Sequence, residues 1–322
     1  VATQSGSGTM SRLDTLPLTA RFVNATQSYG MYLYKAVWPT GLAPFYPHSG
    51  DSELGLAFWF GALALTTGTL LSLMLLRRAP YVAAGWVWYL VTLLPVSGIM
   101  QAGIQAYADR YTYVSLIGVF CAAVWGADAL RRRMHVSPTL VHATCSAVLL
   151  LCFVATWQQV QRWRNDETLF SHTLKVTENN HVAHMILGNV YYEQGKLEEA
   201  IDQYQAGLEI EPNDADIYAA MGLALSAQGK TEAAMSHYKA ALNLNPDHVP
   251  ARSKLASILL SQGTYDHAIV QFEQTLARAP DHVVALNGLG LAYAGQGRYD
   301  KRLASRRHGP DIDANNAALH AD

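Results

Sequence analysis

Residues 181–214 read HVAHMILGNVYYEQGKLEEAIDQYQAGLEIEPND, and the same order of residue types returns 34 positions later and again 34 positions after that. A small residue recurs in phase at Gly188, Gly222 and Ala256, and a glycine follows each of them seven positions later. Three further positions recur in the same order: Ala200, Tyr204, Pro212; Ala234, Tyr238, Pro246; Ala268, Phe272, Pro280. Several kinds of residue keep one phase over 181–280, so this stretch is a repeat array.

The order of small, aromatic and proline positions predicts two antiparallel helices in each copy. The small residue lets the second helix approach the first, the following glycine turns the chain, and the proline ends the second helix because it cannot continue a helix interior. One such hairpin cannot bury its apolar face alone, so successive copies stack into a superhelix with a concave groove. The pattern resembles the tetratricopeptide (TPR) repeat, whose arrays bind peptides or partner proteins far more often than they catalyse reactions.

Charge is distributed unevenly along the 322 residues. Charged residues make up 15% of the chain, against about 25% in an average globular protein. The segments 54–76, 82–100 and 139–157 contain no Asp, Glu, Lys or Arg, whereas the repeats are rich in charge. The net charge of −2 argues against nucleic acid as a partner.

Four apolar segments predict membrane spans: 54–76, 82–100, 114–130 and 140–157. The first is a 23-residue uncharged run, enough to cross a hydrocarbon core of about 30 Å at about 1.5 Å per residue. Pro95 is tolerable in the second span if neighbouring helices satisfy the freed carbonyl. Four such runs so close together exclude a soluble TPR scaffold.

The basic residues predict how these spans are oriented. Arg77, Arg78 and the three arginines at 131–133 lie in the two short loops that must share a side, which makes that side cytoplasmic. Residues 1–53, the loop 101–113 and everything after Trp157 then lie on the opposite face, in a periplasm or a secretory lumen. The sequence begins at Val1 and ends within a repeat, so we expect it to be part of a longer protein.

Two stretches outside the spans carry candidate chemistry. Residues 18–38 are rich in Tyr and Trp and suit a helix at the headgroup level, although a buried helix is the alternative. In the loop 101–113, Asp109 and Arg110 are adjacent and flanked by tyrosines. An arginine there can hold a phosphate or carboxylate with its guanidinium fork, and Asp109 can orient it. Alternatively, Arg110 reaches lipid headgroups and pairs with Asp109.

Side chains of the first helix in each repeat are expected to line the groove. We expect nine lining residues: Met185, Asn189, Tyr192, Ala219, Leu223, Ser226, Ser253, Ser257 and Leu260. A clamp for a terminal carboxylate needs Lys or Arg beside Asn in this row, so chaperone-tail binding is disfavoured. The row instead suits an extended segment whose backbone Asn189 contacts.

Neither metal nor disulfide chemistry is expected. His181 and His184 lie one turn apart, but no third ligand follows on that face, so they are interpreted as turn and packing residues. Cys121, Cys145 and Cys152 lie in apolar runs, where free cysteine behaves as a small hydrophobe. No cofactor is implied.

The two ends of the repeat array are irregular. Asn165 is a candidate N-cap for a helix over 166–177 that matches the second helix of a preceding repeat. In the fourth copy, Arg302 replaces the alanine and Arg306 the aromatic residue, so we expect the helix there to be frayed or absent.

Three stretches together resemble a known family: SYGMYLYKAVWPTGLAPFYPH (28–48), YADRYTYVSLIGVF (107–120) and RWRNDETLFSHTLKVTENN (162–180). They are similar to polytopic proteins with C-terminal TPRs, the transmembrane-and-TPR O-mannosyltransferase-like (GT-C) family. The resemblance implies transfer of a sugar from a polyprenyl-phosphate carrier to protein. The family's catalytic acidic residues lie upstream of this chain, so no catalytic residue is assigned. It also implies that Lys35, Asp109 and Arg110 border the carrier phosphate and that the groove captures the acceptor.

The predicted fold is all-α, with polytopic transmembrane helices followed by a TPR α-solenoid. Its parts are an external lead (1–53), four transmembrane helices (54–157), a junction with a capping helix (158–180), three full repeats and a partial fourth (181–300), and a degraded repeat with a tail (301–322). Two functions remain open: the C-terminal part of a GT-C-like glycosyltransferase, or a membrane-anchored TPR adaptor without chemistry.

Overall fold

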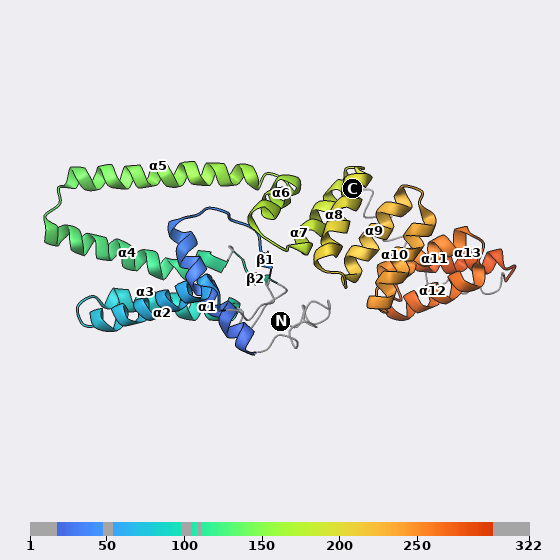
Figure 1. Cartoon of the computed structure of the whole chain (residues 1–322), viewed down its shortest axis with the longest axis horizontal. Coiled ribbons are helices and arrows are strands. Elements are labelled where there is room, and N and C mark those ends of the chain that lie inside the picture. The colour runs from blue at the N-terminus through green and yellow to red at the C-terminus, as the bar shows by residue number, and fades with distance from the viewer. Residues whose placement is uncertain (1–17, 48–53, 98–104, 109–110, 299–322) are drawn as a thin grey trace. The chain divides into compact units, whose positions relative to one another are not determined.

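The computed structural model describes residues 18–47, 54–97, 105–108 and 111–298. These residues are mostly helical, and the chain divides into two compact units, residues 1–180 and 181–322 (Figure 1). The fold is all-α, and the described residues add one short pair of strands. The expected irregularity at 301–310 and the candidate residues Asp109 and Arg110 lie outside the described residues.

The first unit contains six helices among its described residues. Their bounds are α1 Leu18–Val37, α2 Leu56–Leu75, α3 Pro80–Leu93, α4 Thr112–Met134, α5 Pro138–Arg162 and α6 Asp166–Val176. A 3₁₀ turn, Leu94–Val96, follows α3. The expected N-cap of α6 is confirmed, because the side chain of Asn165 accepts a hydrogen bond from the Thr168 N–H.

Among the described residues, three helices, α2, α4 and α5, are long and apolar enough to cross a membrane. The second expected span differs, because α3 has 14 residues and covers about 21 Å at 1.5 Å per residue, less than a hydrocarbon core. The expected span 82–100 runs past Ser97, where the described residues stop, so the four-span prediction stays a prediction for this segment. The α-helix ends at Leu93 because proline has no N–H to donate and its ring clashes with the preceding turn.

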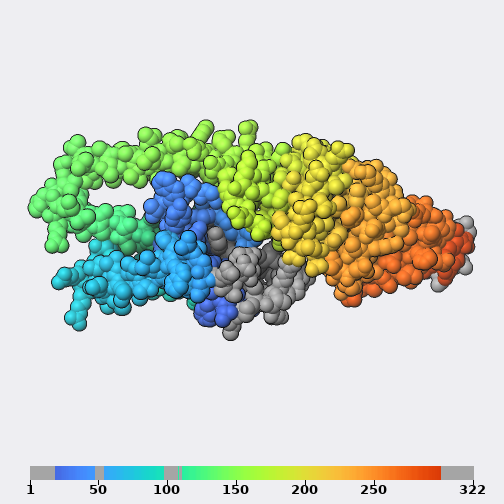
Figure 2. Space-filling view, viewed as in Figure 1, coloured from blue at the N-terminus to red at the C-terminus, as the bar shows by residue number. Residues whose placement is uncertain are grey.

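Helix α5 is the least embedded of these helices. It has no buried residue along its 25 positions within the described structure. The space-filling view shows α5 standing apart from α4 over much of its length (Figure 2). The long apolar sides of α5 therefore need a covering other than the described residues of the first unit.

Glycines set the closest helix contacts in this unit. Gly85 of α3 lies against Gly118 of α4, where a Cβ added to Gly118 would stand 2.6 Å from the Gly85 carbonyl oxygen. Gly30 of α1 meets Gly61 of α2 in the same way, with an added Cβ 2.6 Å from the Gly61 Cα. Small residues let helix backbones approach this closely inside a membrane, so these two contacts fix α1 to α2 and α3 to α4.

Helix α1 is joined to α3 by two tyrosines. The Tyr29 hydroxyl donates to the Leu90 carbonyl at 2.7 Å, and the Tyr89 hydroxyl donates to the Tyr29 carbonyl at 2.6 Å. The rings meet edge to face, 5.7 Å apart. One face of α1 is thus buried in the helix bundle, while Phe22, Val37 and other apolar side chains on α1 stay exposed.

A pair of short strands was not predicted. Strand β1, Tyr46–Pro47, pairs antiparallel with β2, Gln105–Tyr107. Periodicity cannot find strands this short, and only the fold brings these segments together. The Tyr32 hydroxyl then receives the Ala108 N–H at 3.1 Å and donates to the Ala108 carbonyl at 3.2 Å, which holds the end of β2 on α1.

The second unit is a stack of helical hairpins. The helices are α7 His181–Glu193, α8 Leu197–Ile210, α9 Ala215–Ala227, α10 Thr231–Leu244, α11 Val249–Ser261, α12 Tyr265–Arg278 and α13 Val283–Gly295. Each second helix ends two residues before the repeat proline at 212, 246 or 280, as expected. The glycines between paired helices have φ near +75°, a left-handed conformation that other residues adopt only at a cost.

The small, aromatic and alanine positions of the repeat pack against one another as expected. The aromatic residue of the second helix lies over the small residue of the first, Tyr204 on Gly188 and Tyr238 on Gly222. The alanines at 200, 234 and 268 are fully buried in the same cores. This close approach explains the small residues, since a Cβ at Gly188 would stand 2.5 Å from the Tyr204 ring.

Candidate functional site

The nine predicted groove residues all lie on α7, α9 and α11, the first helices of successive hairpins. These first helices contact one another along the stack. Met185, Tyr192 and Ala219 are half-buried and pack against the core, and Leu260 packs against the next core. Leu223, Ser226 and Ser257 are also half-buried, whereas Ser253 is only 3% exposed. The row therefore offers one uncharged wall, with little of Ser253 available to a ligand.

Asn189 is the exposed amide of this row. Its side-chain oxygen accepts the Tyr204 hydroxyl at 2.7 Å, which fixes the amide orientation. The amide nitrogen is then directed away from Tyr204 and is a donor for a carbonyl oxygen. A peptide backbone presents such carbonyls at regular intervals, so this geometry suits an extended polypeptide.

Two histidines cap helices in this unit. The Nδ1 atom of His248 accepts the Ala251 N–H at 3.0 Å, and Nδ1 of His282 accepts the Ala285 N–H at 3.2 Å. The Nε2–H of His248 then donates to Asp216 at 3.0 Å, which lowers the pKa of that carboxyl. His184 contacts Gln203 at 2.9 Å. Within the described residues, no three His, Cys, Asp or Glu side chains are grouped to hold a metal ion.

Lys35 is the described member of the predicted phosphate site, and it is 7% exposed. Its ammonium donates to the Tyr46 hydroxyl and lies 3.6 Å from the centre of the same ring. That hydroxyl accepts the Ala43 N–H at 2.8 Å and donates to the Gly41 carbonyl at 2.9 Å. The loop after α1 is thus folded around the Lys35 ammonium.

The structure also brings Lys35 near the residues that flank Asp109 and Arg110. Tyr46 is paired with Tyr107 across the two strands. Ala108 is held by Tyr32, one turn before Lys35 on α1, and the Tyr111 N–H donates to the Ala108 carbonyl at 3.1 Å. The two sequence segments that carry the predicted phosphate site therefore meet at the end of α1.

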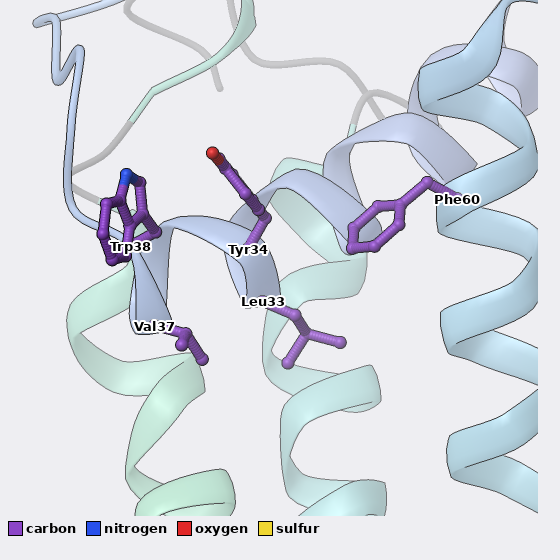
Figure 3. A pocket seen from close by; sticks show the side chains of 5 residues that line it. All are labelled: Leu33, Tyr34, Val37, Trp38 and Phe60. Atoms are coloured by element: carbon purple, nitrogen blue, oxygen red, sulfur yellow. The ribbon is translucent and has the colours of Figure 1, made fainter.

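Two hollows lined by described residues open beside α1. One, of about 510 Å³, is lined by Leu33, Tyr34, Val37, Trp38 and Phe60. Figure 3 shows Phe60 reaching from α2 toward α1, while the Tyr34 hydroxyl points away from Leu33 and Val37. The other, of about 530 Å³, lies between the end of α1, the start of α4 and the end of α5.

The second hollow contains residues that sequence reasoning missed. Lys35 lines it together with Thr112 of α4, Gln159 of α5 and Trp163, which directly follows α5. Gln159 and Trp163 were not predicted because the spacing along one helix gives no sign of what faces another. Only the presence of Trp163 just beyond an apolar run is a signal that the sequence offers, and it indicates a membrane boundary.

Comparison with known proteins identifies the repeats. TPR-repeat models match residues 188–229, 219–279 and 268–303. The second part of the chain is a TPR α-solenoid. The matches begin at Gly188, within α7, and cover α8 to α13 in full.

One curated relative is "Protein O-mannosyl-transferase Tmtc3" of Drosophila melanogaster, 27% identical over 128 residues. The match covers 39% of this chain and 14% of that protein. The chain thus corresponds to a small part of that relative.

Several solved structures align with part of this chain. A crystal structure of MamA aligns at 26% identity with a TM-score of 0.43, over 47% of this chain and 89% of that one. YrrB, described as a TPR protein with an unusual peptide-binding site, aligns at 24% with a TM-score of 0.41, over 52% and 86%. The first TPR of Spaghetti (RPAP3), bound to an HSP90 peptide, aligns at 24% with a TM-score of 0.36, over 37% and 94%.

Proposed function

We propose that this chain is a membrane-anchored TPR protein whose groove binds an extended, largely uncharged polypeptide segment. The observation that carries the proposal is the continuous uncharged row on α7, α9 and α11, with the Asn189 amide oriented by Tyr204. The half-buried Leu223 and Leu260 supply apolar contact, and the amide supplies a hydrogen bond to the backbone. An acidic peptide tail finds no cation at these nine positions.

The polypeptide in the groove is, in this proposal, an acceptor for glycosylation. The chain would be the C-terminal part of a GT-C-like glycosyltransferase that takes its sugar from a polyprenyl-phosphate carrier. The similarity to the O-mannosyl-transferase supports this reading. Lys35, Asp109 and Arg110 would border the carrier phosphate, and the meeting of their flanking segments at the end of α1 favours it. Alanine at Arg110 that leaves the activity of the full-length enzyme unchanged overturns this residue assignment.

A second candidate is a membrane-anchored TPR adaptor without chemistry, and the repeat fold itself favours it. The two candidates share the groove and differ in the rest of the protein. Sequencing the DNA upstream of the codon for Val1 separates them. Further spans with a loop that carries paired carboxylates support the enzyme, and their absence supports the adaptor.

The groove is tested by photo-crosslinking in the full chain, solubilised in mild detergent. A benzophenone side chain at Leu223 captures polypeptide if the concave row is the binding surface. The control places the same side chain at exposed Ala233 on α10. Capture at Leu223 and none at Ala233 supports the proposal, and equal capture at both positions contradicts it.

We propose that the repeats lie on the non-cytoplasmic side of the membrane. We also propose that the chain divides into five parts: 1–53, 54–157, 158–180, 181–300 and 301–322. The exposed arginines at 77–78 and the arginines 131–133 in the last turn of α4 support the orientation. Protease added to sealed right-side-out vesicles then digests the repeats. Full protection of the repeats reverses the orientation and removes the carrier-phosphate role of Asp109 and Arg110.

A further inference from the structure

We propose that the hollow between α1 and α2 is a contact site for the bilayer, in which Leu33, Val37 and Phe60 hold an acyl chain of the surrounding lipid. The site depends on the membrane anchoring in the proposed function, and its ligand is ordinary bilayer lipid. The hollow has a volume of about 510 Å³, and none of the five residues that line it is charged. Phe60 comes from α2, and the other four come from the end of α1 and the residue after it.

Helix α1 crosses the candidate span α2 close to the start of that span. Gly30 of α1 lies against Gly61, and the rings of Tyr34 and Phe60 meet edge to face with their centres 6.4 Å apart. Gly61 is five residues, about 7.5 Å, inside α2, which begins at Leu56. A helix that lies in the membrane surface buries its apolar side about 5–10 Å into the boundary between headgroups and chains. The crossing thus places α1 at the depth of such a helix.

The direction of α1 also fits a helix in the membrane surface. Figure 1 and Figure 3 show α1 lying across α2, α3 and α4 instead of running alongside them. Its hydrogen bonds go to the end of α3, where the Tyr29 hydroxyl donates to the Leu90 carbonyl, and to the turn after α3, where the Asn24 amide donates to the Ser97 carbonyl at 3.5 Å. One side of α1 therefore faces along the spans, and the other faces away from them.

The side chains around the hollow are sorted by polarity between these two sides. Figure 3 shows Leu33 and Val37 on the side toward which α4 continues, whereas the Tyr34 hydroxyl and the Trp38 ring nitrogen point the opposite way. Tyr and Trp take this orientation at membrane surfaces, because the ring is apolar while the O–H or N–H needs water or a headgroup. The apolar side chains are thus directed toward the hydrocarbon and the polar atoms toward the headgroups.

The apolar surface at the hollow has no covering among the described residues. Val37 is 83% exposed, and Trp38 and Phe60 are exposed as well. A contiguous apolar surface of this kind marks contact with a membrane or with another protein. Lipid is favoured because the surface continues along the candidate span, where Leu63, one turn after Phe60 on α2, is 66% exposed.

Nitroxide labels on single cysteines measure depth when the full chain is reconstituted in phosphatidylcholine vesicles. The chain carries alanine at its three native cysteines and one label, at Val37→Cys, Tyr34→Cys, Leu63→Cys or Ala233→Cys. Leu63 is the reference for the span, and exposed Ala233 on α10 is the reference for water. Oxygen concentrates in the bilayer and a nickel chelate stays in water, so the ratio of their collision rates with the label reports its depth.

We expect the ratio of oxygen to nickel collisions to rise in the order Ala233, Tyr34, Val37, Leu63. Nickel access at Val37 equal to that at Ala233 overturns the site, while a lipid-facing Leu63 keeps the anchoring. A Val37 label shielded from both reagents means that a protein segment covers the hollow, which overturns the lipid assignment. A Tyr34 label deeper than Val37 overturns the orientation of α1. Nickel access at Leu63 defeats the membrane anchoring of the proposed function, and the site with it.

Trp38 gives a second measurement that leaves the native cysteines in place. In vesicles whose lipids are brominated at one chain position, bromine quenches the fluorescence of nearby tryptophans. The difference in quenching between the wild type and Trp38→Phe is the quenching of Trp38 itself. We expect bromine near the headgroup end of the chain to quench Trp38 more than bromine near the chain terminus. Equal, small quenching by both lipids overturns the site.

Discussion

The hydroxyl of Tyr204 donates a 2.7 Å hydrogen bond to the side-chain oxygen of Asn189, across the two helices of one hairpin. In the next hairpin, Leu223 occupies the position equivalent to Asn189, and the buried hydroxyl of Tyr238 has no partner among the described residues. Burial raises the pKa of both phenols. One repeat position thus carries a satisfied hydroxyl in the first copy and an unsatisfied one in the second.

Tyr238→Phe is expected to stabilise the repeats or leave their stability unchanged. The substitution removes a buried hydroxyl without a partner, whose desolvation costs about 1–3 kcal/mol. The same change at Tyr204 loses a hydrogen bond and should lower stability by about 1 kcal/mol. Thermal unfolding of the two variants beside the wild type checks the contrast. A loss at Tyr238 equal to that at Tyr204 would show that the Tyr238 hydroxyl does have a partner.

Asn189→Leu should destabilise the first hairpin by about 1–2 kcal/mol, because it leaves the Tyr204 hydroxyl buried without an acceptor. Adding Tyr204→Phe to this variant should recover most of the loss, since the double variant contains no orphaned group. A double-mutant cycle by chemical unfolding measures the coupling. Additive losses would mean that the two side chains do not interact in solution.

The contact between His248 and Asp216 predicts a dependence of stability on pH. The hydrogen bond from His248 lowers the pKa of Asp216 in the folded state. The Asp216 carboxylate therefore contributes fully to folding stability above its unfolded-state pKa of about 3.9, and this contribution is lost as the pH falls through the lower folded-state pKa. Asp216→Asn should therefore cost stability at pH 6 and cost progressively less below pH about 4. The size is about 0.2–1 kcal/mol, because the carboxylate is largely exposed.

The control for this effect is Asp281→Asn, at an exposed aspartate before α13. His282 caps α13 as His248 caps α11, but Pro250 occupies the position equivalent to Asp216, so the third repeat lacks this carboxylate. Unfolding midpoints across pH 3–7 for both variants give the measurement. A loss in Asp216→Asn that stays constant across this range would contradict the linkage.

Gly118→Ala should separate α3 from α4. The added methyl group would meet the Gly85 carbonyl oxygen at 2.6 Å, and overpacking of this kind costs about 1–3 kcal/mol. Gly126→Ala, on the same helix, is the matched control because an added Cβ there meets nothing within 4 Å. The melting temperature of the detergent-solubilised chain checks both. If Gly126→Ala is as damaging as Gly118→Ala, the α3–α4 contact is not what limits stability.

Much of the repeat fold could be predicted from the sequence because its contacts are local. Tyr204 meets Gly188 sixteen positions earlier, and the turn needs one left-handed residue, which Gly195 provides. The same spacing in each copy therefore fixes helix bounds, turns and core. Three of the four predicted apolar spans are long apolar helices among the described residues, and length and composition were enough to predict them.

The candidate sites were predicted only in part. The groove row followed from repeat phase, but the burial of Ser253 and the anchoring of Asn189 by Tyr204 depend on packing. Lys35 was chosen from a resemblance, and its burial against Tyr46 could not be read from the two segments. Nothing in the sequence indicated that Gln159 lines a hollow, because that depends on which helix lies opposite α5.

The sequence by itself determined the periodic part of this protein, because a 34-residue repeat encodes contacts between neighbours in the chain. Tertiary structure alone decided that the regular part of α3 ends before Pro95, that Tyr46 pairs with Tyr107, and that α1, α4 and α5 enclose a hollow. The physical reason is that an apolar helix is compatible with many neighbours. Only close contacts such as that of Gly85 with Gly118, together with buried hydrogen bonds, select one arrangement.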